Sequence, residues 1–295
     1  MTTDTRTAVV LNSRTRATPT KAVRRTLIHV GLVSAAFVMI YPLLWMASAS
    51  IRPSGEVFTS TGLWVSNPTL ENFVSGWTSV GSVGFGVFFL NSAIIAVLAV
   101  IGTVLSCSLA AYAFARLKFR GKKVWFALMI GTIMLPYQVL LIPQYLLFSN
   151  LGWLDTFLPL VVPKFLATEA FFVFLLVQFF RVLPKELFEA ARLDGCGYFG
   201  TYARVVLPLS IPALATTAAF SFIWSWNDFL NPLIYLTSPQ NFTVPIGLSL
   251  FVDTSGSSNY GGLFAMSLLS LLPVIGFFLS FQKLLLDGIS TTGLK

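Results

Sequence analysis

The sequence predicts an all-α integral membrane protein with six transmembrane helices, and two features carry that prediction. Hydrophobic residues make up 56% of the 295-residue chain and charged residues only 10%, whereas a soluble domain carries about 25% charged residues. The apolar residues also form continuous runs that are long enough to cross a hydrocarbon layer of about 30 Å as helices. Strands of a membrane barrel would alternate apolar and polar residues instead.

Six apolar segments are the predicted spans: residues 27–50, 85–115, 124–148, 158–180, 209–236 and 262–286. The second is longer than a bilayer requires, so we expect it to be tilted or partly outside the core. The fourth contains Lys164 and Glu169 and has two prolines in its outer part, which we expect to be irregular. Residues 1–26 are polar and basic and are predicted to form a disordered tail ahead of one transmembrane domain, 27–295.

The distribution of Lys and Arg predicts the orientation of the spans. Of these 19 residues, six lie in the N-terminal tail, five in 116–123, four in 181–207 and two near the C-terminus. Cytoplasmic loops carry the excess of positive residues, so these segments and both termini are predicted to be cytoplasmic. The loops 51–84, 149–157 and 237–261 are then on the outside. The net charge of +8 thus reflects topology, and we expect no nucleic-acid partner.

The loop before the fifth predicted span carries the most informative segment, LPKELFEAARLDGCGYFGTYARVVLPLSIP, residues 183–212. Pro184 suits the first turn of a helix, and Gly195 suits its end. The predicted helix, 185–193, is short enough to be marginal in isolation, so it needs a surface to dock against. The small residues Ala190 and Ala191 would let a partner approach closely. From these residues alone, a helix that covers the ends of its own bundle explains the segment equally well.

The same segment resembles the EAA loop of ABC-importer permeases. Glu189-Ala190-Ala191, three residues, Gly195, nine residues and then Val205-x-Leu207-Pro208 match its spacing, with Val in place of the usual Ile. The resemblance implies that the loop 181–208 forms a cytoplasmic coupling helix, which sits in a cleft of a separate ATPase subunit. The residues that it assigns to this coupling are Glu186, Glu189, Ala190, Ala191, Asp194, Gly195, Leu207 and Pro208.

Further motifs resemble one branch of that family, the carbohydrate-importer permeases of the maltose-MalG type. They are NPTLENF at 67–73, WNDFL at 226–230, FTVPIGL at 242–248, and Gln282-Lys283 followed by the C-terminal Gly-Leu-Lys. The resemblance covers roughly residues 25–295 and implies the MetI/MalG-like fold. It also implies that the outer loop 237–261 reaches into a substrate-binding protein.

Three residues of the fifth predicted span, Trp226, Asn227 and Asp228, are candidates for the substrate path. An ionisable side chain in a membrane usually faces protein or water. Asp228 is therefore either part of a polar, aromatic patch that a sugar touches, or a residue that lies near the outer end of the span or caps a helix ending before Pro232. The spacing of Lys164 and Glu169 does not place them on one helix face, so no ion pair is assumed. We expect Asn91, Gln138 and Gln144 to bond across helices.

The chain lacks the signatures of an enzyme. Gly121-Lys122 is not a Walker A motif, no metal-binding cluster is evident, and the chain has one histidine, His29. Cys107 and Cys196 have no metal-ligand spacing, and no disulfide is expected between them. We therefore expect no cofactor in this chain, with ATP and Mg²⁺ bound by the partner ATPase.

The resemblance implies the permease subunit of a binding-protein-dependent carbohydrate importer in the inner or plasma membrane. Its implied partners are a homologous second permease chain, two ATPase subunits and an extracytoplasmic binding lipoprotein or periplasmic protein. Two alternatives stay open: an ion-coupled secondary transporter, or an ABC importer for another solute such as a glycerophosphodiester or a polyol. A secondary transporter would work without other chains and would be insensitive to ATP depletion.

Overall fold

The computed structural model describes residues 19–59, 62–78, 83–252 and 259–290, and this part of the chain contains helices and no strand. The chain divides into two compact units, Met1–Met46 and Ala47–Lys295. Helix α1 (Pro19–Ser50) accounts for the described residues of the first unit and begins earlier than the expected residue 27. Of the predicted N-terminal tail, residues 1–18 lie outside the described residues.

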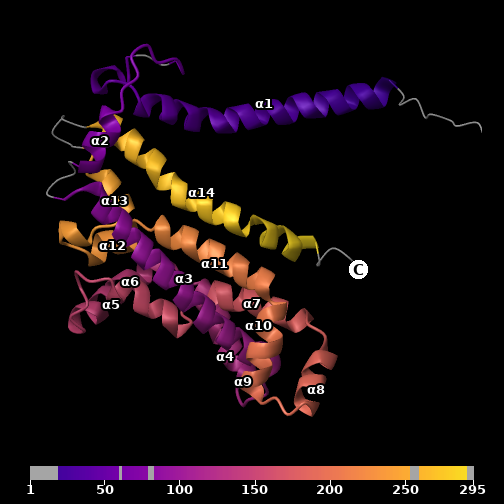
Figure 1. Ribbon diagram of the computed structural model, residues 1–295. Helices are drawn as coiled ribbons and strands as arrows, with labels where there is room; N and C mark the ends of the chain where they lie inside the picture. Colours follow the sequence, from indigo (N-terminus) through magenta and orange to yellow (C-terminus); the bar gives the residue numbers. More distant parts are fainter. Residues whose placement is uncertain (1–18, 60–61, 79–82, 253–258, 291–295) are drawn as a thin grey trace, which may run out of the picture. The chain divides into compact units, whose positions relative to one another are not determined.

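Helix α3 (Phe85–Arg116) is the central element of the second unit and confirms the predicted span 85–115. It packs against α7 (Ala170–Val182), α11 (Ile211–Trp226) and the short η2 (Val162–Leu166) (Figure 1). Gly102 permits the approach to η2, because a Cβ at that position would lie 2.6 Å from the Phe165 ring. Small residues allow this kind of close helix packing in membranes.

The third predicted span is not one helix. It is divided into α4 (Lys122–Ile133) and α5 (Tyr137–Asn150), which meet at an angle of 102°. The break lies at Pro136, which has no N–H to donate and disfavours a helical conformation in the residue before it. The expectation of a continuous helix over 124–148 was therefore wrong.

The fifth predicted span, 209–236, is also broken and shorter than expected. Helix α11 ends at Trp226, and α12 (Leu230–Tyr235) is a separate element. At its other end, α11 meets the segment Tyr198–Leu209 at an angle of 79°. Pro212 lies in the first turn of α11, where no backbone donor is required, so a new helix begins there instead of continuing.

The fourth predicted span, 158–180, has the irregular outer part that the sequence predicts. It comprises α6 (Leu158–Val161), η2 and α7, and the chain leaves the helical conformation at Ala167, where φ is +55°. The sixth, α14 (Tyr260–Ser290), is continuous. By length and composition, four described helices can cross a membrane, or up to six if each bent pair forms one span.

Short elements gather at the two ends of α3 (Figure 1). Helices α2 (Glu71–Thr78) and α13 (Val244–Ser249) lie near its beginning, with η1 (Ser54–Glu56) and η4 (Pro239–Asn241) in the same predicted outer loops. The opposite end carries α8 (Lys185–Leu193), α9 (Tyr198–Thr201), the π-helical η3 (Tyr202–Val206) and α10 (Leu207–Leu209). This opposite end is the predicted cytoplasmic side.

Candidate functional site

Helix α8 spans the residues predicted for the coupling helix, Lys185–Leu193, and follows Pro184 directly. Glu186 in the first turn and Arg192 in the last turn complement the helix dipole. The helix presents most of its predicted coupling residues to the surroundings, because Glu186, Glu189, Ala190 and Asp194 are all exposed. Leu193 is 89% exposed, so the described residues leave a large apolar side chain uncovered at the end of the helix.

The two alanines of α8 do not share a face, which corrects one prediction. Ala190 is exposed, but Ala191 is only 6% exposed and packs inward. A helix turns by about 100° per residue, so neighbouring residues cannot both point at one partner. Ala190 alone can meet an external surface, while Ala191 lets α8 approach the rest of its own chain.

The glycine stop after α8 has the geometry that the sequence predicts. Gly195 has φ of +77°, a region that L side chains rarely adopt. The amides of Asp194 and Cys196 donate to the carbonyls of Ala190 and Ala191, both at 2.9 Å, and so close the end of the helix. A Cβ at Gly195 would meet nothing within 4 Å, so backbone conformation alone makes glycine suitable there.

Leu207 and Pro208 lie apart from α8, in α10, where the chain turns back towards the membrane. Leu207 is half-buried and Pro208 is exposed. The preceding π-helical turn is fixed to α3, because the hydroxyls of Tyr202 and Ser108 are 2.7 Å apart and hydrogen-bonded. This second part of the loop therefore joins α8 to α11, although Pro208 itself is exposed.

Arg116 at the end of α3 contacts both the end of α7 and α8, a role that the sequence did not reveal. Its guanidinium donates to the carbonyls of Phe180 and Leu183 and lies 4.0 Å from the centroid of the Phe188 ring. From the sequence, Arg116 was only one of the basic residues that indicate topology. No spacing rule links residue 116 to residues 180–188, so no local signal could have found this contact.

The three candidates for the substrate path have different surroundings. Trp226 is only 2% exposed, stacks on Phe222 and donates its indole N–H to the carbonyl of Ser270 at 3.1 Å. It is a core residue of this chain, which corrects its prediction as a path-lining residue. Asn227 is exposed and Asp228 half-buried, so these two remain accessible from outside the chain.

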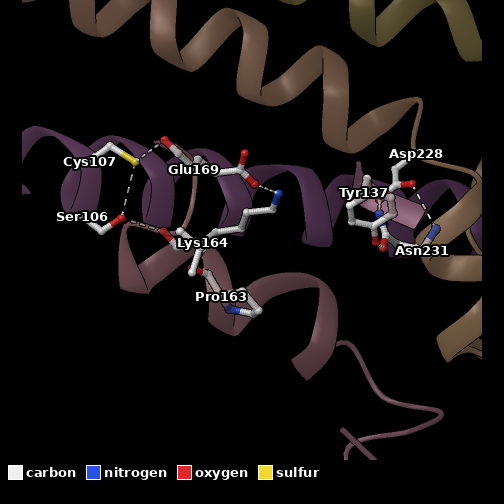
Figure 2. Close-up of polar contacts among 9 residues, drawn as sticks. Ser106, Cys107, Tyr137, Pro163, Lys164, Glu169, Asp228 and Asn231 are labelled. Carbon is white, nitrogen blue, oxygen red and sulfur yellow. Dashed lines mark hydrogen bonds and ion pairs between the residues drawn. The ribbon is translucent and has the colours of Figure 1, made fainter. Parts of the chain in front are cut away.

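Asp228 accepts hydrogen bonds at the first turn of α12, a helix that continues through Pro232 instead of ending before it as one interpretation of the sequence predicted. Its carboxylate accepts hydrogen bonds from the backbone N–H and the side-chain amide of Asn231, at 3.2 and 2.8 Å. The hydroxyl of Tyr137 on α5 donates to the same Asn231, so the two broken spans meet at this polar group (Figure 2). Gln144 also bonds across helices as expected, accepting from Tyr235.

Lys164 and Glu169 form an ion pair that the sequence spacing did not predict (Figure 2). The chain breaks between them at Ala167, and the break brings together two side chains that a continuous helix would separate. The backbone on either side is tied to α3, because Ser106 donates to the carbonyl of Lys164 at 2.7 Å. The two side chains are 30% and 26% exposed, so the pair is partly accessible.

A carboxylate that sequence reasoning missed, Asp155, joins two outer loops. It accepts hydrogen bonds from the backbone N–H groups of Thr237 and Ser238 at 3.0 and 2.9 Å, and from the Ser238 hydroxyl. These bonds, led by that of the Ser238 hydroxyl, hold the pKa of the Asp155 carboxyl well below its usual range. Asn241 donates to the carbonyl of Asp155 at 2.7 Å and completes the junction.

Metal-binding groups do not gather in the part of the chain that the structure describes. No three His, Cys, Asp or Glu side chains there lie close enough to hold an ion. Cys107 and Cys196 are both free.

The chain is similar to known transport proteins over most of its length. Residues 102–290 match the family described as binding-protein-dependent transport system inner membrane component. The arabinooligosaccharides transport system permease protein AraQ of Halalkalibacterium halodurans is 35% identical over 272 residues, 91% of this chain and 96% of that protein. The trehalose/maltose transport system permease protein MalG of Thermococcus litoralis is 33% identical, over 93% of this chain and 98% of that protein.

The fold has a solved counterpart as well. A chain of a bacterial ABC transporter involved in the import of the acidic polysaccharide alginate superimposes with a TM-score of 0.79. The match covers 91% of this chain and 98% of that chain, at 22% identity, which shows the shared fold alone. With the family match over residues 102–290 and relatives above 30% identity along nearly the whole length, the chain belongs to the family of binding-protein-dependent transport system inner membrane components.

Proposed function

We propose that this chain is a permease subunit of an ATP-driven importer for carbohydrates and that α8 is its docking element for the ATPase. The observation that carries the docking proposal is α8 itself, whose predicted coupling residues Glu186, Glu189 and Ala190 face outward. The carbohydrate proposal is supported by the names of the relatives, which include arabinooligosaccharide and trehalose/maltose permease proteins. The exposed helix α8 and the names of the relatives favour this proposal over the alternative of an ion-coupled secondary transporter.

The proposed assembly contains a second, homologous permease chain, two ATPase subunits that bind ATP and Mg²⁺, and an extracytoplasmic substrate-binding protein. In this assembly α8 transmits motion by two connections. The first runs through the π-helical turn and α10 into α11, and the second runs through Arg116 into α3. Closure of the ATPase dimer would displace α8, and both connections would carry the displacement into the spans and alternate the access of the path.

The proposed orientation places α8 in the cytoplasm, because the basic loops 116–123 and 181–207 gather at its end of the second unit. Cysteines placed at Lys122 and Ser257, in a background without Cys107 and Cys196, test this orientation. An impermeant thiol reagent applied to intact cells is expected to label only position 257, which lies outside the described residues. Labelling of position 122 alone would reverse the orientation.

The substitution Glu189→Lys tests the docking proposal. Glu189 is exposed, so the variant is expected to insert and fold normally, but to lose a charge-assisted hydrogen bond worth about 1.5–3 kcal/mol and introduce a like-charged repulsion towards a basic partner. Co-purification of the ATPase and substrate uptake are expected to fall together. Gly195→Val is a second test of the same proposal. The left-handed conformation at Gly195 is unfavourable for a β-branched residue, so this variant is expected to distort the end of α8 and to lose the ATPase as well.

A matched control is Lys123→Glu, which also reverses an exposed charge on the same predicted side but outside the loop 181–208. This variant is expected to retain the ATPase. If Glu189→Lys and Gly195→Val both retain the ATPase and transport at the normal rate, α8 is not the docking element.

A further inference from the structure

A cavity of about 600 Å³ lies between the end of α3 and α8, and the proposed docking role assigns no ligand to it. Arg116 and Lys118 line it from the α3 side, Lys185 and Arg192 line it from α8, and Cys196 lines it from the turn after α8. Pockets for small molecules have volumes of about 300–1,000 Å³. The cavity is therefore large enough for a small organic ligand.

The cavity walls carry an excess of positive charge. Four cationic side chains and one carboxylate, Glu189, line it. Among the residues that the structure describes, one pair of opposite charges lies within 4 Å, Lys164 and Glu169, and neither residue lines the cavity. None of the four cavity cations therefore forms an ion pair with a described carboxylate. Clustered charge of one sign in a recess concentrates counter-ions. An anion is the ligand that this charge distribution favours.

Arg116 supplies a fixed cation in this wall. Two backbone carbonyls and the Phe188 ring hold its guanidinium, while its buried Nε has no hydrogen-bond partner among the described residues. On the same wall, Tyr112 donates to the carbonyl of Tyr198 at 3.0 Å, which fixes α9 against α3. Phosphate groups suit such a site, because the guanidinium matches their geometry and Lys residues add point charges.

We propose that this cavity binds a phosphate-bearing anion and that the bound anion bridges α8 to the end of α3. Its phosphate would come from a soluble phosphorylated metabolite or from the headgroup of an anionic lipid, since both present the same chemistry. Glu189 lines the cavity, so an occupied site changes the position or charge of the proposed docking helix. That consequence rests on the proposed function of α8, whereas binding of the anion does not.

Cys196 provides a reporter for the proposal, because it lines the cavity and is half-buried, while Cys107 is fully buried. The full-length chain with its partner permease is studied in inside-out vesicles that have been washed to remove peripheral subunits. Glucose 6-phosphate is expected to slow alkylation of Cys196 by a maleimide about tenfold, the factor that corresponds to about 1.4 kcal/mol of protection. Glucose, the neutral control, is expected to leave the rate unchanged.

The lipid source is tested by reconstitution in phosphatidylcholine alone and in phosphatidylcholine with phosphatidylglycerol. If the headgroup is the natural occupant, phosphatidylglycerol protects Cys196 without glucose 6-phosphate. If the occupant is soluble, only glucose 6-phosphate does so. Either result supports the anion site. Equal rates under all these conditions, equal protection by glucose, or a Cys196 that does not react at all would overturn the proposal.

The double variant Lys185→Gln/Arg192→Gln removes two cavity charges on an exposed helix and is expected to abolish the protection. Lys123→Gln removes an exposed charge outside the cavity and is expected to retain it. Protection that survives the double variant would overturn the proposal. Because alkylation is measured without the ATPase, normal protection together with failed ATPase docking would contradict only the proposed function.

Discussion

The two ends of the second unit are built differently. Side chains bond to backbone groups far away in the sequence at both ends, but at the predicted outer end these bonds join the loops directly: Asp155 bonds to residues 82 and 83 positions later, and Asn91 to the carbonyls of Gln240 and Phe242 at 2.8 and 2.9 Å. At the other end, α8 packs through one face, that of Ala191 and Phe188, and leaves the opposite face exposed.

This difference indicates that the two ends have different roles, the outer end as a rigid part of the fold and α8 as an element that moves with a partner. Backbone groups of residues 237–242 bond to Asp155 and Asn91, so this described part of the outer loop is held against α3 and the loop 149–157. A nine-residue helix with one open face is marginal unless something covers it. Moving elements are usually drawn from the less stable parts of a structure. The outer end therefore suits a fixed platform, and α8 suits contact with a moving partner.

The largest expected effect comes from placing a tryptophan on the open face of α8. Ala190→Trp adds bulk where the chain has no neighbour, so the melting temperature in detergent is expected to stay unchanged while uptake is lost. Ala191→Trp adds the same bulk to the packed face and is expected to cost about 1–3 kcal/mol of folding free energy through overpacking.

Measuring melting temperature and uptake for both variants, with Ala190→Ser as a conservative control, separates docking from folding. Normal uptake by Ala190→Trp would mean that the open face meets no partner. The two ends would then differ in the exposure of their residues but not in their contact with a partner.

An intermediate effect is expected at the outer end from Asp155→Asn. The pKa of Asp155 is lowered in the folded protein, so its stabilisation is present above the unfolded pKa of about 3.9 and is lost as the pH falls towards the folded value. The wild-type melting temperature is expected to drop below about pH 4, whereas the variant starts lower at neutral pH and changes less through this window.

Thermal melting of both proteins at stepwise lower pH provides the measurement, and Asp194→Asn, which removes an exposed carboxylate at the other end, is the control. If the two substitutions shift the melting temperature equally, the outer junction is no more rigid than the loop after α8.

The smallest expected effect is that of Asp228→Asn, at the point where the broken spans meet. The asparagine keeps an oxygen that can accept the Asn231 backbone N–H, so the cap and the fold are expected to persist. Uptake is expected to fall modestly and the preference among sugars to change, because a charge accessible from outside the chain is removed. Competition uptake with several sugars measures this. Unchanged rate and preference would leave Asp228 with a capping role only.

Local patterns predicted the continuous elements well. The span 85–115 corresponds to α3, and the predicted helix 185–193 has the bounds of α8, because long apolar runs, a proline start and a glycine stop act on neighbouring residues. Local patterns failed for the third and fifth spans. Hydropathy remains high through the break at Pro136 and so conceals it, whereas the polar residues Asn227 and Asp228, at the break after Trp226, were assigned to a continuous span.

The sequence by itself determined that the chain lies in a membrane, where the long helices run, and that residues 185–193 form a short helix with a glycine stop. These properties depend on composition and on residues a few positions apart. Only the tertiary structure decided that Trp226 belongs to the core, that Ala191 faces inward, that Lys164 pairs with Glu169, and that Asp155 joins the outer loops. Those outcomes depend on how distant segments pack and on where helices break, and neither the spacing nor the type of a residue specifies its partners across the fold.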